Sequence, residues 1–173
     1  EQYKETLYTR IMQMALTFVS AHNMPCLLVL DAFFPTGSVF KMAASFWSIS
    51  LKQPFIQLII RAKKSYVAYF EAIPPQKEKS TKGPKYGEKV KLYEVFDQIH
   101  LFAKVKARIY GKDEEIRLLA ADLLWKPTAG LIRFVFAITS RGPIVLMCSD
   151  LEIDPVVAIE CYCLRVRIEI MID

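Results

Sequence analysis

Three residues near the end of the chain, Tyr162, Arg165 and Glu169, combine a phenol, a guanidinium and a carboxylate at helical spacing. Because an α-helix advances about 100° per residue, the three side chains fall within an arc of about 60°. Apolar residues flank this face on two sides, which predicts a buried helix. A carboxylate there is costly unless it is paired or metal-bound, so Glu169 is a candidate site residue. An ordinary ion pair between Arg165 and Glu169 is the alternative.

Asp31 is the second candidate carboxylate. It follows the apolar run from Cys26 to Leu30, which is typical of a buried strand. A side chain at the end of such a strand lies at the edge of an α/β sheet and can face a ligand. Converging carboxylates hold Mg²⁺ or Mn²⁺, and two such ions about 3.5–4 Å apart activate water at a phosphodiester. A turn-forming or helix-capping aspartate is the alternative.

The composition describes one well-packed domain, or a domain core with an insertion, because 53% of the 173 residues are apolar. No apolar run approaches the roughly 20 residues that span a bilayer, and no signal peptide is evident. The four cysteines lack Cys-x2-Cys spacing, and His22 and His100 are far apart. We therefore expect a reduced, cytoplasmic protein without a zinc site.

The chain looks like an internal piece of a longer protein. It begins on Glu1 rather than methionine and stops at Asp173, four residues after Glu169, without a helix stop. Its net charge of +5 suits phosphate binding but does not establish it. Trp47 and Trp125 could stack on an unpaired base, with core packing as the alternative.

The first half of the chain predicts two helices and two buried strands. Apolar residues at helical spacing predict a helix over residues 2–20. Ser38 can cap a second helix, with Trp47 on its inner face. Residues 55–60 form the second apolar run and lead into a basic cluster. That cluster consists of Arg61, Lys63 and Lys64.

The second half predicts an antiparallel, strand-rich region and a last helix. Residues 74–91 are rich in lysine, proline and glycine, which indicates a mobile loop or an insertion boundary. Strand-like segments then alternate with turn signals. These segments are residues 101–110, 116–125, 131–139 and 144–148. Asp154 and Pro155 are a typical start for the last helix.

These residues resemble a family. The spacing Tyr162-x2-Arg165-x3-Glu169 resembles the C-terminal signature of the DDE-type insertion-sequence transposases, in the branch defined by Tyr, Arg, Glu and a later Lys. LLVLDAFF, residues 27–34, is similar to the second-aspartate motif of that family, and FIQLIIRAKK, residues 55–64, to the strand that follows it. CSDLEIDPVVAIECYCLRVRIEIMID, residues 148–173, matches the usual approach to the glutamate helix.

The resemblance implies an α/β fold: an incomplete RNase H-like (ribonuclease H-like) catalytic core with a β-rich insertion before the last helix. Core residues would be 1–73, the insertion 74–150 with the basic loop 74–91, and the truncated glutamate-bearing helix 151–173. Asp31 and Glu169 would be the second and third metal-binding carboxylates, holding Mg²⁺ or Mn²⁺. Tyr162 and Arg165 would hold DNA at the cleavage site, with the basic cluster as further DNA contacts.

The implied function is DNA cleavage and strand transfer at insertion-sequence ends by the full-length protein, in the bacterial cytoplasm and at the nucleoid. Its partners are element-end and target DNA, with a homodimer left open and no membrane. An RNase H-like nuclease or resolvase is one alternative. A decayed, non-enzymatic DNA-binding remnant is the other.

Two features depart from the family pattern. Its first aspartate belongs on a strand before Asp31, yet residues 1–30 contain no aspartate, and the terminal lysine would lie beyond Asp173. Asp150 also follows an apolar run and is a rival second aspartate, but its place in the lead-in to the last helix favours a turn role. We therefore expect this chain alone not to cleave DNA.

Overall fold

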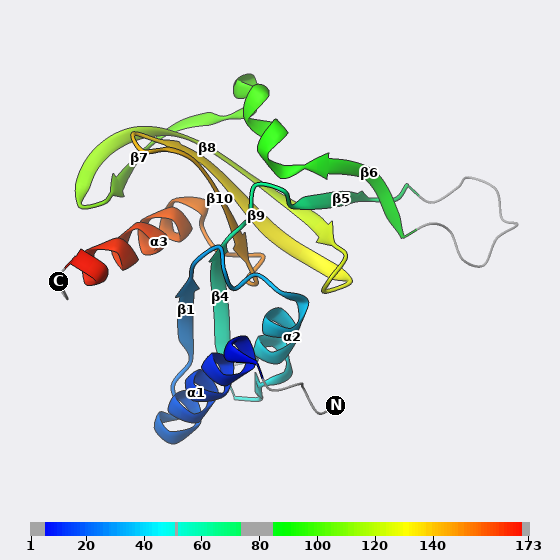
Figure 1. Ribbon diagram of the computed structural model, residues 1–173, viewed down its shortest axis with the longest axis vertical. Helices are drawn as coiled ribbons and strands as arrows, with labels where there is room; N and C mark the ends of the chain where they lie inside the picture. The colour runs from blue at the N-terminus through cyan, green and yellow to red at the C-terminus, as the bar shows by residue number, and fades with distance from the viewer. Residues whose placement is uncertain (1–5, 51, 74–84, 171–173) are drawn as a thin grey trace, which may run out of the picture.

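The computed structural model describes residues 6–50, 52–73 and 85–170, with side chains as far as Arg165 (Figure 1). Within these residues one mixed sheet runs in the order β1-β4-β10-β9-β8-β5-β6, with β7 paired to β8. All pairs except β1 with β4 are antiparallel. Two helices, α1 and α2, pack on one face of the sheet, and α3 packs on the other. The α/β class predicted from the sequence is therefore confirmed.

Helix α1 (Leu7–His22) begins five residues later than the prediction's start at residue 2, and residues 1–5 lie outside the described part of the chain. The Thr6 side chain caps it, and Thr9 completes a capping box. The buried face consists of Thr9, Met12, Leu16 and Val19. The apolar stripe that suggested the helix faces outward instead, with Leu7, Met14 and Phe18 exposed. The sequence carries two stripes on this helix, and spacing alone does not choose between them.

Strands β1 (Cys26–Leu30) and β4 (Ile56–Arg61) match the two predicted buried strands within one residue. They pair in parallel from Cys26↔Ile56 to Leu30↔Ile60, so their carboxyl ends lie side by side. Parallel strands need a crossover, and helix α2 (Gly37–Ser45) supplies it. Its cap is Thr36 rather than the predicted Ser38, because the Thr36 hydroxyl accepts the amide of Val39.

A short hairpin follows α2, made of β2 (Trp47–Ser48) and β3 (Gln53–Pro54). The helix ends at Ser45, so Trp47 does not extend its inner face, and the indole is 56% exposed. The predicted inner position of Trp47 is therefore wrong. The reason is that the chain leaves helical geometry at Phe46, whose ψ of 96° is extended.

The strand-rich second half is confirmed: three of the four predicted strands are longer than predicted, and the first, predicted over 101–110, is shorter. Strands β5 (Val67–Glu71) and β6 (Tyr86–Lys91) pair with each other. Two short 3₁₀ helices, Leu92–Asp97 and Ile99–Leu101, lead into the antiparallel strands β7 to β10. Those strands are β7 (Ala103–Ile109), β8 (Lys112–Trp125), β9 (Gly130–Thr139) and β10 (Gly142–Cys148).

Two features of this half refine the sequence-based picture. Residues 86–91, predicted as the end of a loop, form β6, because their backbone finds partners on β5; residues 74–84 lie outside the described chain. Strand β10 pairs with β4, with Met147 opposite Ile60. The strands of the predicted insertion therefore continue the sheet of β1 and β4, and the division into segments at residues 73 and 150 stays a prediction.

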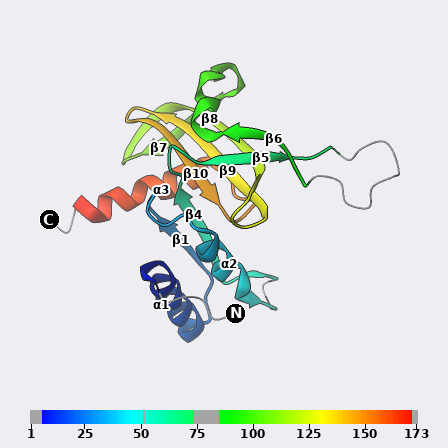
Figure 2. The same cartoon turned by 45° about the vertical axis from the view of Figure 1, so that its right-hand side comes forward.

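Helix α3 (Pro155–Ile170) begins as predicted. The Asp154 carboxylate accepts the amides of Val156 at 2.7 Å and Val157 at 3.2 Å, and Pro155 occupies the first helical position, where no amide is needed. In both views α3 runs from the end of the sheet past the carboxyl ends of β1 and β4 (Figures 1 and 2). Over the described residues, no helix combines the length and apolar character that a bilayer crossing requires.

Candidate active site

Asp31 lies immediately after β1, at the sheet edge where the carboxyl ends of β1 and β4 meet. The amide of Ala32 donates to its Oδ1 at 2.7 Å, which turns the carboxylate back across the strand end. The side chain is 47% exposed. Asp31 is thus a turn residue whose carboxylate is accessible, and its role as a metal ligand stays a prediction.

Tyr162 reaches Asp31 from α3. Its hydroxyl donates to Asp31 Oδ1 at 3.3 Å, joining residues 131 positions apart. The residue is 2% exposed and belongs to the core between α3 and the sheet. Burial raises the pKa of Tyr162, and the charge of Asp31 raises it further, whereas Arg165 and Arg61 oppose the shift. The phenol therefore stays protonated at neutral pH and acts as a hydrogen-bond donor to the carboxylate.

Arg165, one turn further along α3, is the second partner of Asp31. Its Nη2 lies 3.6 Å from Asp31 Oδ2, and its side chain is 23% exposed. The guanidinium carbon lies 5.4 Å from the centre of the Tyr162 ring. Spacing by three residues puts Tyr162 and Arg165 on one helix face, as predicted, and α3 packs so that this face meets the end of β1.

Arg61 supplies a second guanidinium from the last residue of β4. Burial lowers its pKa, but Tyr162 and Tyr93 interact with the guanidinium and the net shift is upward. Arg61 is therefore charged at any physiological pH. Tyr93, in the first 3₁₀ helix, is a neighbour that the sequence did not reveal, because no periodic pattern links it to β4.

The remaining predicted site residues are placed as follows. Lys63 and Lys64 follow β4 and are exposed. Asp150, the rival second aspartate, accepts the amide of Glu152 at 2.9 Å and has the predicted turn role. Glu169 belongs to the last turn of α3, but its side chain lies outside the described residues.

The carboxylate oxygens of Asp31 are of the kind that bind a divalent metal ion. Asp31 offers carboxylate oxygens, which Mg²⁺ and Mn²⁺ prefer. Among the side chains that the structure describes, no group of three or more His, Cys, Asp or Glu residues lies close enough to hold an ion. Within the described side chains Asp31 is the candidate ligand, and the second candidate, Glu169, has its side chain outside them.

Chemically, the arrangement is a half-exposed carboxylate that contacts one guanidinium, Arg165, and one phenol, Tyr162. A second guanidinium, Arg61, interacts with the same phenol, and Lys63 and Lys64 follow it in sequence. Guanidinium groups bind phosphate oxygens in a fixed fork geometry, whereas lysines act as flexible point charges. Comparison with known proteins adds no identity to this picture: the chain matches no family model, and no curated protein is significantly similar to it.

Proposed function

We propose that this chain is part of the catalytic domain of a DDE-type insertion-sequence transposase, built on an RNase H-like core. The observation that carries the proposal is the convergence of Asp31 with Tyr162 and Arg165, through contacts of 3.3 Å and 3.6 Å. The transposase resemblance rests on Asp31 in one segment and on Tyr162 and Arg165 in another. If α3 packed elsewhere on the sheet, Asp31 would lie far from the other two.

In this proposal some residues bind DNA, and Tyr162 holds the Asp31 carboxylate in place. Arg165 and Arg61 bind the phosphate at the cleavage position, and Lys63 and Lys64 contact the flanking backbone. Tyr162 donates to Oδ1 of Asp31, and Oδ2 faces Arg165. When bound, divalent ions activate the attacking water and stabilise the leaving oxygen.

The reaction proposed for the full-length protein has two phosphoryl transfers. Water attacks the phosphodiester at the element end, and the leaving group is the 3′ oxygen of the DNA, which becomes a free hydroxyl. That hydroxyl then attacks a phosphodiester of target DNA and displaces another 3′ oxygen. The parallel pair β1–β4, with Asp31 at its carboxyl end and α3 alongside, supports the RNase H-like core.

The test is Mg²⁺-dependent cleavage of element-end DNA by the full-length protein. Asp31→Ala and Glu169→Ala should each lower the rate by on the order of 100-fold or more, since even outer-shell changes at metal sites cost 10- to 100-fold. Asp150→Ala is the matched control and should cleave normally, because Asp150 holds a turn. Normal cleavage by both site variants would reject the assignment.

Strand transfer separates a transposase from a nuclease. Pre-cleaved element ends with a free 3′ hydroxyl should be joined to target DNA by the full-length protein and not by Asp31→Ala. Cleavage without joining would instead identify an RNase H-like nuclease or resolvase. DNA binding with neither reaction would identify a non-enzymatic remnant.

A further inference from the structure

The turn between β7 and β8 holds a tyrosine in a backbone conformation that tyrosines rarely adopt. Ile109 pairs with Lys112, so Tyr110 and Gly111 form a two-residue hairpin turn. Both have a positive φ, 49° at Tyr110 and 84° at Gly111, as a type I′ turn requires. Asparagine, aspartate and glycine are the usual residues at the first of these positions, because a bulky side chain is strained there. Such strain persists where contacts of the side chain with the rest of the structure compensate for it.

The first of these contacts is with the neighbouring hairpin. Arg141 lies in the turn between β9 and β10, and its Cζ atom is 3.8 Å from the centre of the Tyr110 ring. The same two turns are joined a second time, because the Ser140 hydroxyl donates to Glu114 Oε1 at 3.2 Å. Arg141 is exposed, whereas Tyr110 is half-buried and packs against the core between α3 and the sheet. The guanidinium therefore holds the tyrosine ring against that core.

The second contact of Tyr110 is with α3. The core against which Tyr110 packs contains Tyr162 and Cys163. Burial raises the pKa of the Cys163 thiol, and hydrogen bonds with the backbone and the side chain of Tyr110 oppose the shift. Burial also raises the pKa of Tyr110, and the neighbouring Cys163 and Tyr162 raise it further. Tyr110 therefore lies beside the segment of α3 from which Tyr162 reaches Asp31.

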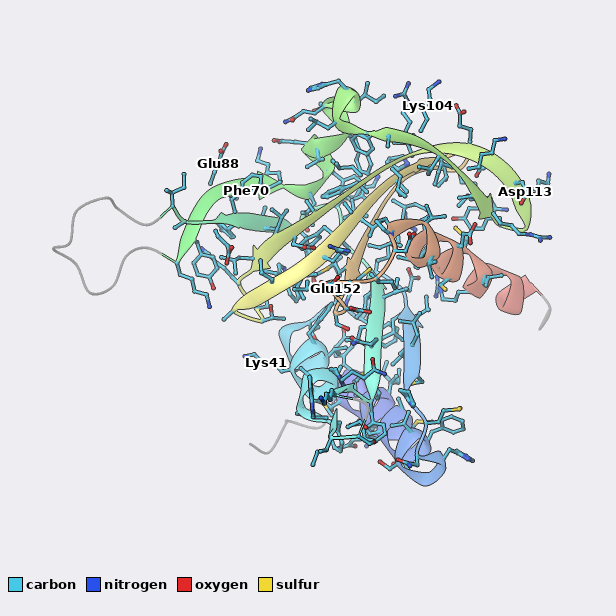
Figure 3. All side chains as sticks on the ribbon, turned by 180° about the vertical axis from the view of Figure 1, so that it is seen from behind. Lys41, Phe70, Glu88, Lys104, Asp113 and Glu152 are labelled. Carbon is cyan, nitrogen blue, oxygen red and sulfur yellow. The ribbon has the colours of Figure 1, made fainter. Side chains whose placement is uncertain are left out.

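A further contact joins β7 to α3 about one turn earlier on the helix. The Glu160 carboxylate accepts the amide of Arg108 at 2.7 Å. Arg108 precedes Tyr110 by two residues, and Glu160 precedes Cys163 by three, so both elements run past each other in the same direction. Figure 3, which labels Asp113 near this end of the hairpin, shows the hairpin end beside α3. Two separate contacts between the same elements fix both the rotation of α3 about its axis and its position along the sheet.

The rotation of α3 decides whether its side chains reach Asp31. Because a helix with its side chains is about 10–12 Å across, a rotation of about 20° moves the end of a side chain by about 2 Å. A shift of that size is enough to break the 3.3 Å contact between the Tyr162 hydroxyl and Asp31. Arg165, on the same face of α3, would move with it.

We propose that Tyr110 is a positioning residue for the candidate active site. Stacked on Arg141 and packed against α3, it holds the helix at the rotation at which Tyr162 and Arg165 face Asp31. The site therefore depends on the β7–β8 and β9–β10 turns, which contribute no residue to the mechanism above. The inference concerns the geometry of the site, and its consequence for DNA cleavage rests on the proposed function.

The experiment measures the contact between Tyr162 and Asp31 when Tyr110 is changed. A double-mutant cycle with Tyr162→Phe and Asp31→Ala, followed by urea unfolding, gives the coupling between the two side chains. With Tyr110 in place, the coupling should change the equilibrium constant of unfolding about threefold to tenfold, as expected for one hydrogen bond. In the Tyr110→Asn background the factor should fall to about one, although asparagine suits the turn better than tyrosine does.

Three further variants separate positioning of α3 from a general effect on stability. Tyr110→Phe keeps the ring on Arg141 and should keep most of the coupling. Ala129→Asn is the matched control, because Ala129 also has a positive φ, 54°, but lies in the turn between β8 and β9; it should leave the coupling unchanged. Arg141→Ala removes the stacked guanidinium at an exposed position and should lower the coupling, so it provides the test if Tyr110→Asn does not fold.

The outcomes separate the positioning role from the proposed function. Full coupling in Tyr110→Asn, or in Arg141→Ala where it provides the test, would overturn the inference, as would an equal loss of coupling in Ala129→Asn. In the full-length protein, Tyr110→Asn should cleave element-end DNA on the order of tenfold more slowly than Tyr110→Phe, because small displacements of reacting groups are costly. Loss of coupling in Tyr110→Asn without cleavage by any form of the protein, the unsubstituted one included, would support the positioning role and reject the proposed function.

Discussion

The carboxylate of Asp31 contacts a backbone amide, a phenol and a guanidinium, and only the phenol is buried. Arg165 and Asp31 are 3.6 Å apart and both reach solvent, so water and salt screen their attraction. Their pairing therefore adds little to the free energy of unfolding, and its main effect is to fix the position of the Arg165 guanidinium relative to the carboxylate. It keeps positive charge beside the carboxylate, where the proposed function places a phosphate of the DNA.

A double-mutant cycle measures this pair. Combining Asp31→Ala with Arg165→Ala should reveal a coupling free energy of about 0.2–1 kcal/mol in urea unfolding. The pair Asp122 and Arg133 is the comparison, because its two hydrogen bonds of 2.9 Å and 3.1 Å are bidentate and its side chains less exposed on average. A larger coupling for Asp31–Arg165 than for Asp122–Arg133 would contradict this view of the site.

The buried thiol of Cys148 should make the stability of the protein depend on pH in the alkaline range. Burial in β10 raises the pKa of its thiol to about 12, and Arg133 opposes the shift. The unfolded thiol ionises near pH 9.0 while the folded thiol keeps its proton, so the stabilising contribution is complete below pH 9.0. This contribution to the free energy of unfolding is lost as the pH rises toward 12, by about 1.4 kcal/mol per pH unit.

The measurement is the free energy of unfolding by urea between pH 8 and 11. Cys148→Ala should lower stability at pH 8 yet flatten the decline above pH 9. Cys161→Ala, at a half-buried position, is the control and should leave most of the slope. An unchanged slope in Cys148→Ala would mean that other groups cause the alkaline loss.

At the scale of elements, α3 is the part on which the site depends most. It carries Tyr162 and Arg165, and its first turn is held by the Asp154 carboxylate through two amides. Glu160, on the same helix, accepts the amide of Arg108 at 2.7 Å and ties α3 to β7. The helix is thus anchored at its start and along its length before it reaches Asp31.

Removing the cap of α3 should weaken the whole fold. Asp154→Ala should lower the free energy of unfolding by about 1 kcal/mol, whereas Asp154→Asn, which can accept the same amides, should cost only a few tenths. Chemical denaturation of both variants checks this. An equal loss of unfolding free energy in the two variants would show that the charge of Asp154, rather than its hydrogen bonds to the amides, stabilises the helix.

The contact between α2 and the β8–β9 turn gives a second element-scale prediction. Gly37→Ala would force a Cβ to within 2.4 Å of the Pro127 carbonyl and should cost about 1–3 kcal/mol. Gly130→Ala is the control, because the nearest atom to its added Cβ is 3.9 Å away. The midpoint temperatures of thermal unfolding of the two variants should differ by several degrees. Similar midpoints would show that the β8–β9 turn can shift away from the added Cβ at little cost.

For the whole molecule, the sheet has a buried middle and less protected ends. Strand β9 pairs along its length with β8 and β10, and residues 134–137 are at most 1% exposed. In the described part of the chain, β1 pairs only with β4, and β6 only with β5. The candidate site therefore lies at an end of the sheet, on elements that depend on the middle for support.

Native-state hydrogen exchange should follow this arrangement. Amides of β9 and β10 should exchange only through global unfolding, whereas those of β6 and of the outer edge of β1 should exchange through smaller openings. Mass spectrometry on peptides from each strand would measure this. Uniform protection across the sheet would contradict the expected gradient.

Much of the element order could be predicted because its signals are local. Apolar runs marked β1 and β4, and Asp154-Pro155 marked the start of α3. Errors arose where local signals were duplicated. Thr36 and Ser38 are both good caps, and α1 has apolar residues on two faces, so only packing against the sheet chose between them.

By itself, the sequence determined which residues can do chemistry and which helix face carries Tyr162 and Arg165, since side-chain type and helical period are properties of a few consecutive residues. Only the tertiary structure decided that this face meets Asp31, 131 residues from Tyr162. That meeting requires the parallel pairing of β1 with β4, the joining of β10 to β4, and the packing of α3 across them. Such long-range contacts are selected by burial of the whole core, which no local pattern encodes.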